Sequence, residues 1–462
     1  SDYFQVSRSA VSREKSASRR STGREMHDMG KNIFRWLCSL LAIFSLPLLM
    51  AGCAGIAKGV TQAILEKKET ATTDARQCYV RGRPFEGLET FLSREEKGVS
   101  EPGAKCPDLK VLMVHGMGSH QPGYSARMAE NLTRALSLDR VQEQYKELTL
   151  YRPQDPERKL GNLRVCRFMN GDGSRNMIFY ELTWDSIVEQ EKQDISFDGS
   201  EEYAYRRATI NRLLKEFVNN TLPDVLMYNG TSHEMIHLAV AQSLCWMLTR
   251  EWEELPDRGA DSCDPEKENI VKNLDDEIVF ITHSLGSRIT VDTMQRLATI
   301  VRSDPRMSAC ADALKNKKFT VFMLSNQLPL LELGRPKPEV TGQISAICSP
   351  TGSRSNERLF GELKIVAFSD PNDLFSYPLP PRFVDEHLDS RICPTLTNVI
   401  LNVAPVNDLF GLGGVANPVS AHTSYDNDSR VIGLITRGIG GPDTDPEVNE
   451  YCTWIEAVPE KR

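Results

Sequence analysis

The stretch IVFITHSLGS, residues 278–287, decides the fold class of this chain. Its first four residues are β-branched or aromatic, as in a strand that is buried on both faces. The strand runs into a turn of small residues around Ser284 and then into a helical pattern, so the turn can present the serine hydroxyl. Thr282 stands where the G-x-S-x-G pattern has its first glycine, which crowds the turn slightly. The order strand, serine turn, helix predicts a parallel α/β sheet with Ser284 as a candidate nucleophile.

Other apolar runs of strand length alternate with amphipathic helical patterns along residues 106–462, which is typical of a mostly parallel sheet covered by helices on both faces. Residues 186–230 are acidic and then helical, and they are longer than a minimal crossover needs. We therefore expect a helical insertion there, over the sheet edge or as a lid over the active site. The predicted strands are Lys110–His115, Asn176–Thr183, Glu277–Thr282, Phe319–Leu324, Leu363–Phe368 and Asn398–Asn402.

A second motif, VLMVHGMG, covers residues 111–118 and again joins a buried strand to a glycine-rich turn. The turn resembles the loop that in α/β-hydrolases brings a backbone N–H toward the substrate carbonyl, together with the N–H of the residue after the nucleophile. These two donors are Met117 and Leu285, which predicts an oxyanion hole. Alone, Gly116 and Gly118 would indicate only a turn after a strand, but the two motifs occur in the order that this chemistry needs.

The carboxylate of a catalytic triad should follow a later strand. Phe319–Leu324 is followed by no carboxylate until Glu332, whereas Leu363–Phe368 leads directly into Asp370 and Asp373. Asn372-Asp373 followed shortly by Pro378 resembles the loop of lipases at this point, which implies Asp373 as the acid, and Asp370 remains the alternative. The composition Asp-Pro-Asn-Asp would also suit a turn or a helix cap.

The base should come last in the chain, and the sequence contains 8 histidines. His422 follows the last predicted strand and precedes a helical pattern, whereas His387 precedes that strand. His115 belongs to the glycine-rich turn, and His283 occupies the variable position beside the nucleophile. The resulting chain order is Ser284, Asp373, His422.

With these motifs, residues 105–440 resemble the serine lipase/esterase branch of the α/β-hydrolase superfamily. The resemblance implies that Ser284 attacks an acyl carbonyl, that His422 carries its proton and that Asp373 holds the imidazole. It also implies an acyl ester or lipid substrate and no cofactor or metal. The family includes inactive members, so a catalytically silent scaffold that binds protein is an alternative.

The N-terminal region has the features of a secretion signal. Residues 36–51 form an apolar run of sixteen residues, too short to span a bilayer comfortably and of the length of a signal-peptide core. The sequence LMAGC, residues 49–53, resembles the bacterial lipobox, which implies that Cys53 carries lipid after cleavage. Ala54 follows the cysteine, and by the same resemblance this implies the outer membrane, with the body facing the periplasm.

These features divide the chain into four expected parts. Residues 1–25 are a non-native or disordered extension, residues 26–52 the lipoprotein signal peptide, residues 53–105 a tether and residues 106–462 the α/β-hydrolase domain. Beyond residue 52 the chain carries 47 Lys and Arg against 59 Asp and Glu, and so acidic a body argues against nucleic-acid binding. Nine cysteines follow Cys53, so at least one thiol is expected to stay free.

One motif supports a different class of enzyme. HEMIH, residues 233–237, matches the H-E-x-x-H pattern, in which two histidines on one helical face bind zinc beside a glutamate. However, His237 also lies on an apolar stripe, where a buried structural histidine suffices, and Glu234 could belong to a capping turn. A zinc metallopeptidase is therefore the less favoured alternative.

Overall fold

The computed structural model describes residues 77–92, 107–141, 145–153, 155–197, 208–264, 273–408 and 414–455. All of them belong to one compact unit. The predicted signal peptide, the lipidation site Cys53 and the N-terminal extension lie outside the described residues. Within those residues, no helix combines the length and the apolar character needed to cross a membrane.

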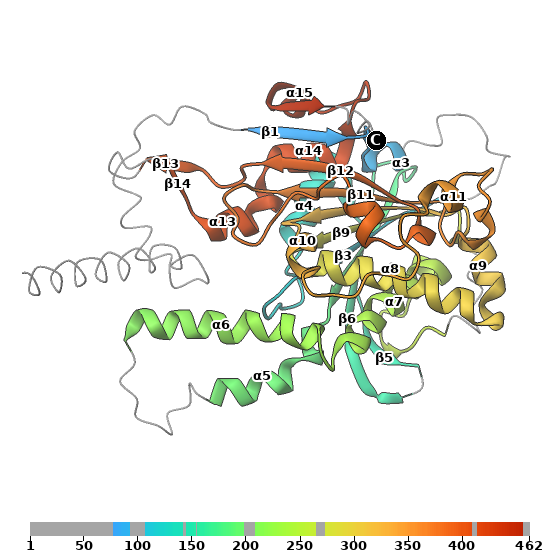
Figure 1. Cartoon of the computed structure of the whole chain (residues 1–462), viewed down its shortest axis with the longest axis horizontal. Helices are drawn as coiled ribbons and strands as arrows, with labels where there is room; N and C mark the ends of the chain where they lie inside the picture. Colours follow the sequence, from blue (N-terminus) through green and yellow to red (C-terminus); the bar gives the residue numbers. More distant parts are fainter. Residues whose placement is uncertain are drawn as a thin grey trace, which may run out of the picture. The chain divides into compact units, whose positions relative to one another are not determined.

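A mixed sheet of 12 strands with helices around it organises the described part of the chain (Figure 1). Its six central strands are parallel and follow the spatial order β7-β3-β9-β10-β11-β12. They are β7 (Asn176–Thr183), β3 (Leu109–Val114), β9 (Glu277–His283), β10 (Lys318–Leu324), β11 (Glu362–Ser369) and β12 (Pro394–Leu401). These are the six strands predicted from sequence, with ends shifted by up to four residues. The mostly parallel α/β architecture is thereby confirmed.

Antiparallel strands extend the sheet at each side. On one side β6 and β5 follow β7, and β8 pairs parallel to β5. On the other side β1 runs antiparallel to β12, and β16 pairs parallel to β1. These added strands are β1 (Cys78–Gly82), β4 (Asp139–Arg140), β5 (Lys146–Arg152), β6 (Asp155–Met169), β8 (Arg258–Asp261) and β16 (Cys452–Ile455).

Residues 77–92 differ from the expected tether. They form β1, β2 (Phe85–Glu86) and α3 (Leu88–Leu92), and β1 is an integral strand of the sheet. Alternate residues of β1, beginning with Cys78 and Val80, are buried. Because its neighbours β12 and β16 lie more than 300 residues away in sequence, no local pattern revealed this pairing. Cys78 and Cys452 join β1 to β16 through a disulfide.

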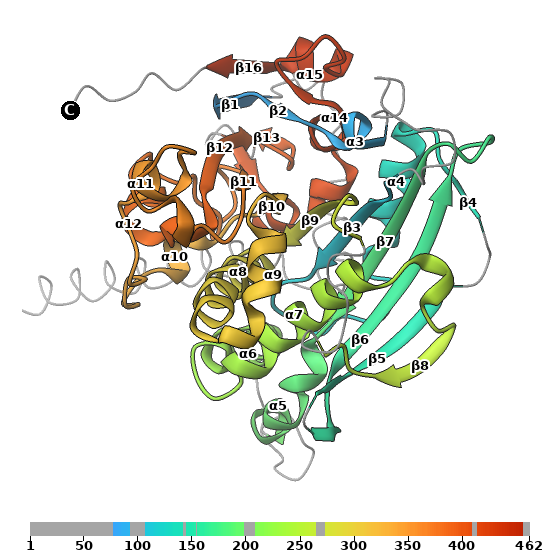
Figure 2. The same cartoon turned by 90° about the vertical axis from the view of Figure 1, so that its right-hand side faces the viewer.

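Helices cover both faces of the sheet because apolar side chains point to both faces, as alternate residues of β3 show. Leu112 and Val114 face one hydrophobic core, while Val111 and Met113 face the other. Figure 2 shows α7, α8 and α9 on one side of the strands and α4 and α14 on the other. The longer helices are α4 (Ala126–Ala135), α5 (Glu189–Ser196), α6 (Thr209–Tyr228), α7 (His233–Thr249), α8 (Leu285–Ser303), α9 (Ser308–Leu314) and α14 (Ser429–Arg437).

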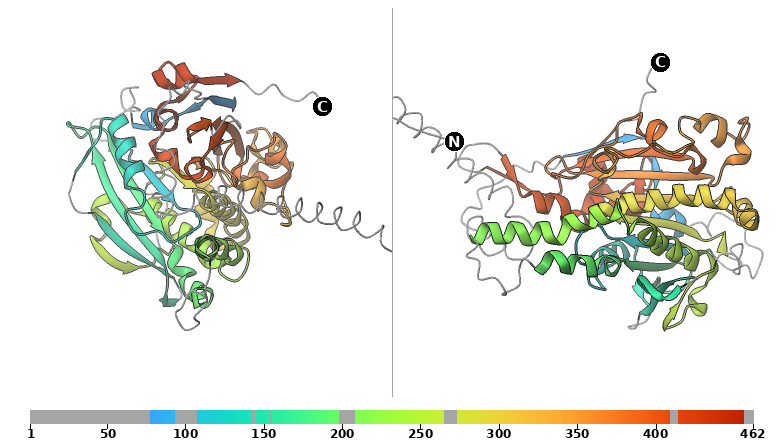
Figure 3. Two further views of the ribbon diagram at one scale, coloured as in Figure 1. Left: turned by 90° about the vertical axis from the view of Figure 1, so that its left-hand side faces the viewer. Right: turned by 60° about the horizontal axis from the view of Figure 1, so that its bottom comes forward.

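Shorter helices lie in the connections after the later strands. They are α10 (Leu328–Leu331), α11 (Ile344–Cys348), α12 (Phe383–His387), α13 (Pro418–Thr423) and α15 (Pro446–Tyr451). The predicted insertion, residues 186–230, contains α5 and α6, which lie next to each other (Figure 3). Since the parallel strands all end at one edge of the sheet, the loops after β3, β9, β10, β11 and β12 meet there.

Candidate active site

Ser284 occupies the turn between β9 and α8, at the carboxyl edge of the sheet. Its backbone has φ 56° and ψ −124°, a conformation that L-residues rarely adopt. The Ser284 amide donates to the carbonyl of Leu324 at the end of β10, at 2.9 Å. Thr282, in the place of the first glycine, directs its Oγ1 to Oγ of Ser287 at 2.9 Å. The turn is therefore strained at Ser284, and the Thr282 hydroxyl beside it has a hydrogen-bond partner.

Two glycines let the turn of residues 115–118, here called the HGMG turn, approach Ser284 closely. A Cβ on Gly116 would lie 2.6 Å from Cβ of Ser284, and a Cβ on Gly286 would lie 2.4 Å from the carbonyl oxygen of Val114. No side chain other than hydrogen fits at either position. The turn after β3 is consequently packed against the nucleophile turn, as an oxyanion hole made by the Met117 and Leu285 amides requires.

His422 and Asp373 complete a hydrogen-bonded chain with Ser284. Nε2 of His422 lies 3.1 Å from Oγ of Ser284, and Nδ1 lies 2.9 Å from Oδ2 of Asp373. His422 is on α13, whose first turn is capped by Asn417 through its side-chain oxygen. The structure brings together the three side chains that sequence reasoning selected, although their positions span 138 residues of the chain.

The carboxylate of Asp373 is held in its ionised form. Burial pushes the pKa of Asp373 upward, but the hydrogen bonds from His422, the Ser325 hydroxyl and the Phe375 amide favour the carboxylate, and the pKa is lowered. An ionised acceptor requires Nδ1 of His422 to carry the proton, so Nε2 presents its lone pair to Ser284. The site thus holds the imidazole in the tautomer that a general base needs.

The alternative acid, Asp370, has another role. Its Oδ1 accepts the Asn372 amide at 2.7 Å, and its Oδ2 accepts the amides of Val403 and Ala404 at 2.7 and 3.2 Å. Asp370 therefore ties the loop after β11 to the chain after β12. Of the two aspartates, it is Asp373 that contacts His422.

Ser325 was missed by the sequence reasoning. It is fully buried at the end of β10, with φ 53°. Its hydroxyl donates to Oδ2 of Asp373 at 2.6 Å, and the same oxygen lies 2.7 Å from Nδ1 of His422. The single hydroxyl proton goes to the carboxylate, so the oxygen can only accept from the imidazole. A small polar residue directly after a parallel strand was the available signal.

His283 was treated as the variable position of the motif, but it contacts the base. Its Nε2 donates to the backbone carbonyl of His422 at 2.7 Å. Burial, and then the neighbouring His422, lower the pKa of His283 to about 3. The neutral ring therefore joins the segment that carries His422 to the turn that carries Ser284.

The two histidines of HEMIH are engaged by protein groups. His237 is 2% exposed, with Nε2 3.1 Å from the Tyr228 hydroxyl and Nδ1 3.3 Å from Oγ1 of Thr293. Nδ1 of His233 contacts the Tyr228 carbonyl at 2.9 Å, and the Glu234 carboxylate pairs with Arg296. These contacts support a structural role for the motif. In the described ranges, no three His, Cys, Asp or Glu side chains form a group that could hold a metal ion.

Buried imidazoles predict a loss of stability in acid. Burial lowers the pKa of His237 to about 3 and that of His115 well below its usual value. In the unfolded chain both titrate near 6.5, so below that pH the unfolded state binds more protons than the folded state. The His237 imidazole should remove about 1.4 kcal/mol of unfolding free energy per pH unit as pH falls from about 6.5 toward 3, and His115 acts in the same direction.

Urea unfolding at pH 7.5, 6 and 5 measures this slope. The variant His237→Gln cannot take up the proton. Its unfolding free energy should therefore fall less steeply as the pH decreases, by the contribution of about one proton. An equal slope in the variant and the wild type would contradict a neutral, buried His237.

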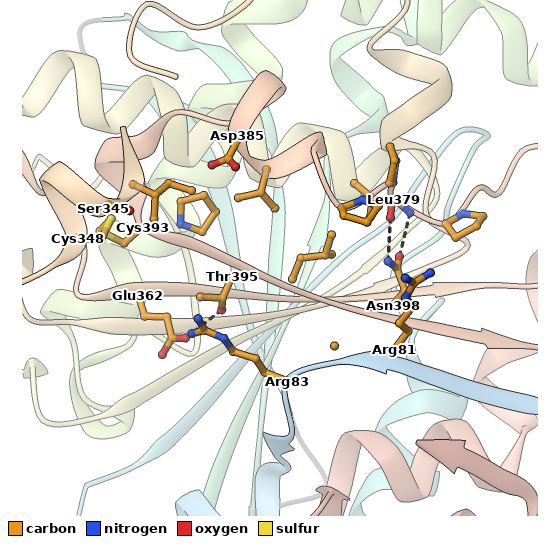
Figure 4. Close-up of a pocket in the computed structure, with 18 of the residues that line it drawn as sticks. Arg81, Arg83, Ser345, Cys348, Glu362, Leu379, Asp385, Cys393, Thr395 and Asn398 are labelled. Carbon is orange, nitrogen blue, oxygen red and sulfur yellow. Dashed lines mark hydrogen bonds between the residues drawn. A yellow bond between two sulfur atoms is a disulfide. The ribbon is translucent and has the colours of Figure 1, made fainter. Parts of the chain in front are cut away.

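The Ser284 side chain, the candidate nucleophile, is buried. Ser284 is 1% exposed. A cavity of about 920 Å³ lies elsewhere, between β1, β12 and the helices α11 and α12 (Figure 4). None of the three candidate triad residues lines this cavity. The His422 side chain beside Ser284 is 16% exposed, so the site reaches the surface at the imidazole.

Comparisons of the chain with protein-family models, with curated proteins and with solved structures found no match. The case for a function consequently rests on the residues and geometry of this chain.

Proposed function

We propose that this protein is a serine hydrolase with an α/β-hydrolase fold that cleaves carboxylic esters through an acyl-enzyme. The observation that carries the proposal is the hydrogen-bonded chain from Ser284 through His422 to Asp373, at the carboxyl edge of a parallel sheet. Nucleophile, acid and base follow β9, β11 and β12 in the order of that fold.

The reaction follows from the positions of these groups. The Ser284 oxygen bonds to the acyl carbon while its proton passes to Nε2 of His422, and the carbonyl oxygen becomes an anion. The Met117 and Leu285 amides would stabilise that anion. The tetrahedral intermediate then expels the alcohol, which takes the proton from His422. Water attacks the acyl-enzyme by the same proton path and releases the carboxylic acid.

Labelling of the full chain with a fluorophosphonate, followed by peptide mapping, tests this proposal. We expect one adduct, on Ser284, and ester hydrolysis that resists metal chelators. An unreactive Ser284 would favour the silent scaffold, and activity that a chelator abolishes would favour a zinc enzyme built on His233 and His237.

We further propose that the mature protein is a lipoprotein of the bacterial outer membrane that faces the periplasm. The lipobox-like residues 49–53 support the anchor. Three disulfides support an oxidising compartment, because such bonds persist outside the reducing cytosol. They join Cys78 to Cys452, Cys245 to Cys263 and Cys348 to Cys393. Among the described cysteines, Cys166 and Cys310 are free.

Cys53→Ala should block lipid attachment and processing. Each buried methylene of an acyl chain contributes about 0.8 kcal/mol to membrane binding, so the wild type should partition into detergent. Mass spectrometry of the mature N-terminus and detergent phase partition measure both effects. A variant that is cleaved at the same bond and stays in the membrane would contradict the lipoprotein assignment.

A further inference from the structure

Two carboxylates accept hydrogen bonds from backbone amides in and just after the HGMG turn. The Gly118 amide donates to Oδ2 of Asp224 at 2.6 Å, and the His120 amide donates to Oδ2 of Asp185 at 3.0 Å. Asp224 lies near the end of α6, and Asp185 lies just before α5. Asp224 therefore comes from the predicted insertion, residues 186–230, and Asp185 directly precedes it.

Asp224 is a fully buried charge on a helix that is otherwise largely exposed. Lys192 of α5 lies 2.6 Å from its Oδ1, and the two side chains are 12% and 0% exposed respectively. Burial raises the pKa of Asp224, and the ion pair with Lys192 opposes that effect. A buried carboxylate is costly unless its partners compensate, and here those partners are the lysine and one backbone amide.

That amide belongs to the residue after the predicted oxyanion donor. Gly116, before Met117, packs against Ser284, and Gly118, after it, is held by Asp224. Gly118 also has φ +98°, where other residues are strained. Met117 thus lies between Gly116, which is packed against the Ser284 turn, and the Gly118 amide, which is hydrogen-bonded to α6.

We propose that Asp224 is a positioning residue of the oxyanion hole, and that α5 and α6 set the orientation of the Met117 amide through it. This inference rests on the proposed esterase function. It assigns to these helices a role different from that of a lid over the acyl chain. A lid would affect long-chain esters more than short-chain esters, whereas a support for the oxyanion hole affects all esters alike.

Asp224→Ala in the full chain tests the inference. We expect kcat to fall about 10- to 100-fold for both p-nitrophenyl butyrate and p-nitrophenyl palmitate, with KM within about twofold, since a donor that loses its orientation resembles a donor removed. The affinity for an alkylboronic acid, which mimics the tetrahedral intermediate, should fall in the same proportion. Glu216→Gln removes an exposed carboxylate from the same helix and should change neither value.

A second pair of variants keeps the test valid if Asp224→Ala folds poorly. In Asp224→Asn the side chain must face two donors, the Gly118 amide and the Lys192 ammonium, with only one oxygen. Adding Lys192→Met removes one donor, so the double variant should recover most of the lost kcat and boronate affinity. If Asp224 only stabilised the fold, the double variant would show no such recovery in kcat while KM stayed constant.

The outcomes separate the two proposals. An active wild type whose kcat and boronate affinity are unchanged in Asp224→Ala would overturn this inference and leave the esterase proposal standing. A loss confined to the palmitate ester would also overturn it, in favour of a lid. A wild-type chain whose Ser284 does not react would overturn both.

Discussion

Ser284→Ala and His422→Ala should each abolish ester hydrolysis to the same residual rate, about 10⁴-fold or more below the wild type. Without His422 the Ser284 hydroxyl has no acceptor for its proton, and without Ser284 the imidazole has no nucleophile to activate. The two losses therefore do not add, and the double variant should be no slower than either single variant. Steady-state kinetics with p-nitrophenyl butyrate measures all three.

Thermal unfolding of the same variants is the control. The Ser284 side chain contributes one hydrogen bond to His422, so its loss should change stability little. Full activity in Ser284→Ala, together with inhibition by a chelator, would replace the triad by the H-E-x-x-H alternative.

Asp373→Asn should be the next most damaging substitution, about 10³- to 10⁴-fold in kcat, whereas Asp370→Asn should reduce kcat only a few-fold. An amide at position 373 can turn its NH2 group toward Nδ1 of His422, which favours the tautomer with the proton on Nε2. That tautomer cannot accept the Ser284 proton.

Asp370→Asn should instead cost stability. The carboxylate accepts the amides of Asn372, Val403 and Ala404, and an amide side chain has one oxygen for three donors. A loss of about 1–3 kcal/mol in unfolding free energy is expected. If Asp370→Asn were the variant that stops catalysis while it folds normally, Asp370 would be the acid.

The strands that could be predicted are those with a local signal. Five of the six central strands are buried over most of their length, so each contains an apolar run that stands out from its surroundings. In β12 buried and half-buried residues alternate, and only its second half was predicted. The flanking strands have an alternating or polar sequence: β6 carries charged residues along its length, and alternate residues of β1 are exposed. Their stability depends on partners far away in the chain, which no local pattern specifies.

The candidate site divides in the same way. Ser284, His422 and the HGMG turn could be selected because each follows a recognisable strand or precedes a helix. The contacts of His283 and Ser325 could not be predicted from sequence, since both side chains contact residues that lie far away in the chain. The role of Asp224 was hidden for the same reason, because α6 meets the HGMG turn across 106 positions of sequence.

The amino-acid sequence was enough to predict the parallel core, the serine turn and the order Ser284, Asp373, His422 along the chain, because strand burial and turn chemistry are local properties. The tertiary structure alone decided which aspartate faces His422, which hydroxyl supports that aspartate, how six cysteines pair and what holds the Met117 amide. Each of these depends on the register between neighbouring strands and on helices that return from distant parts of the chain. Contacts of this kind are properties of packing, and they exist only once the sheet has formed.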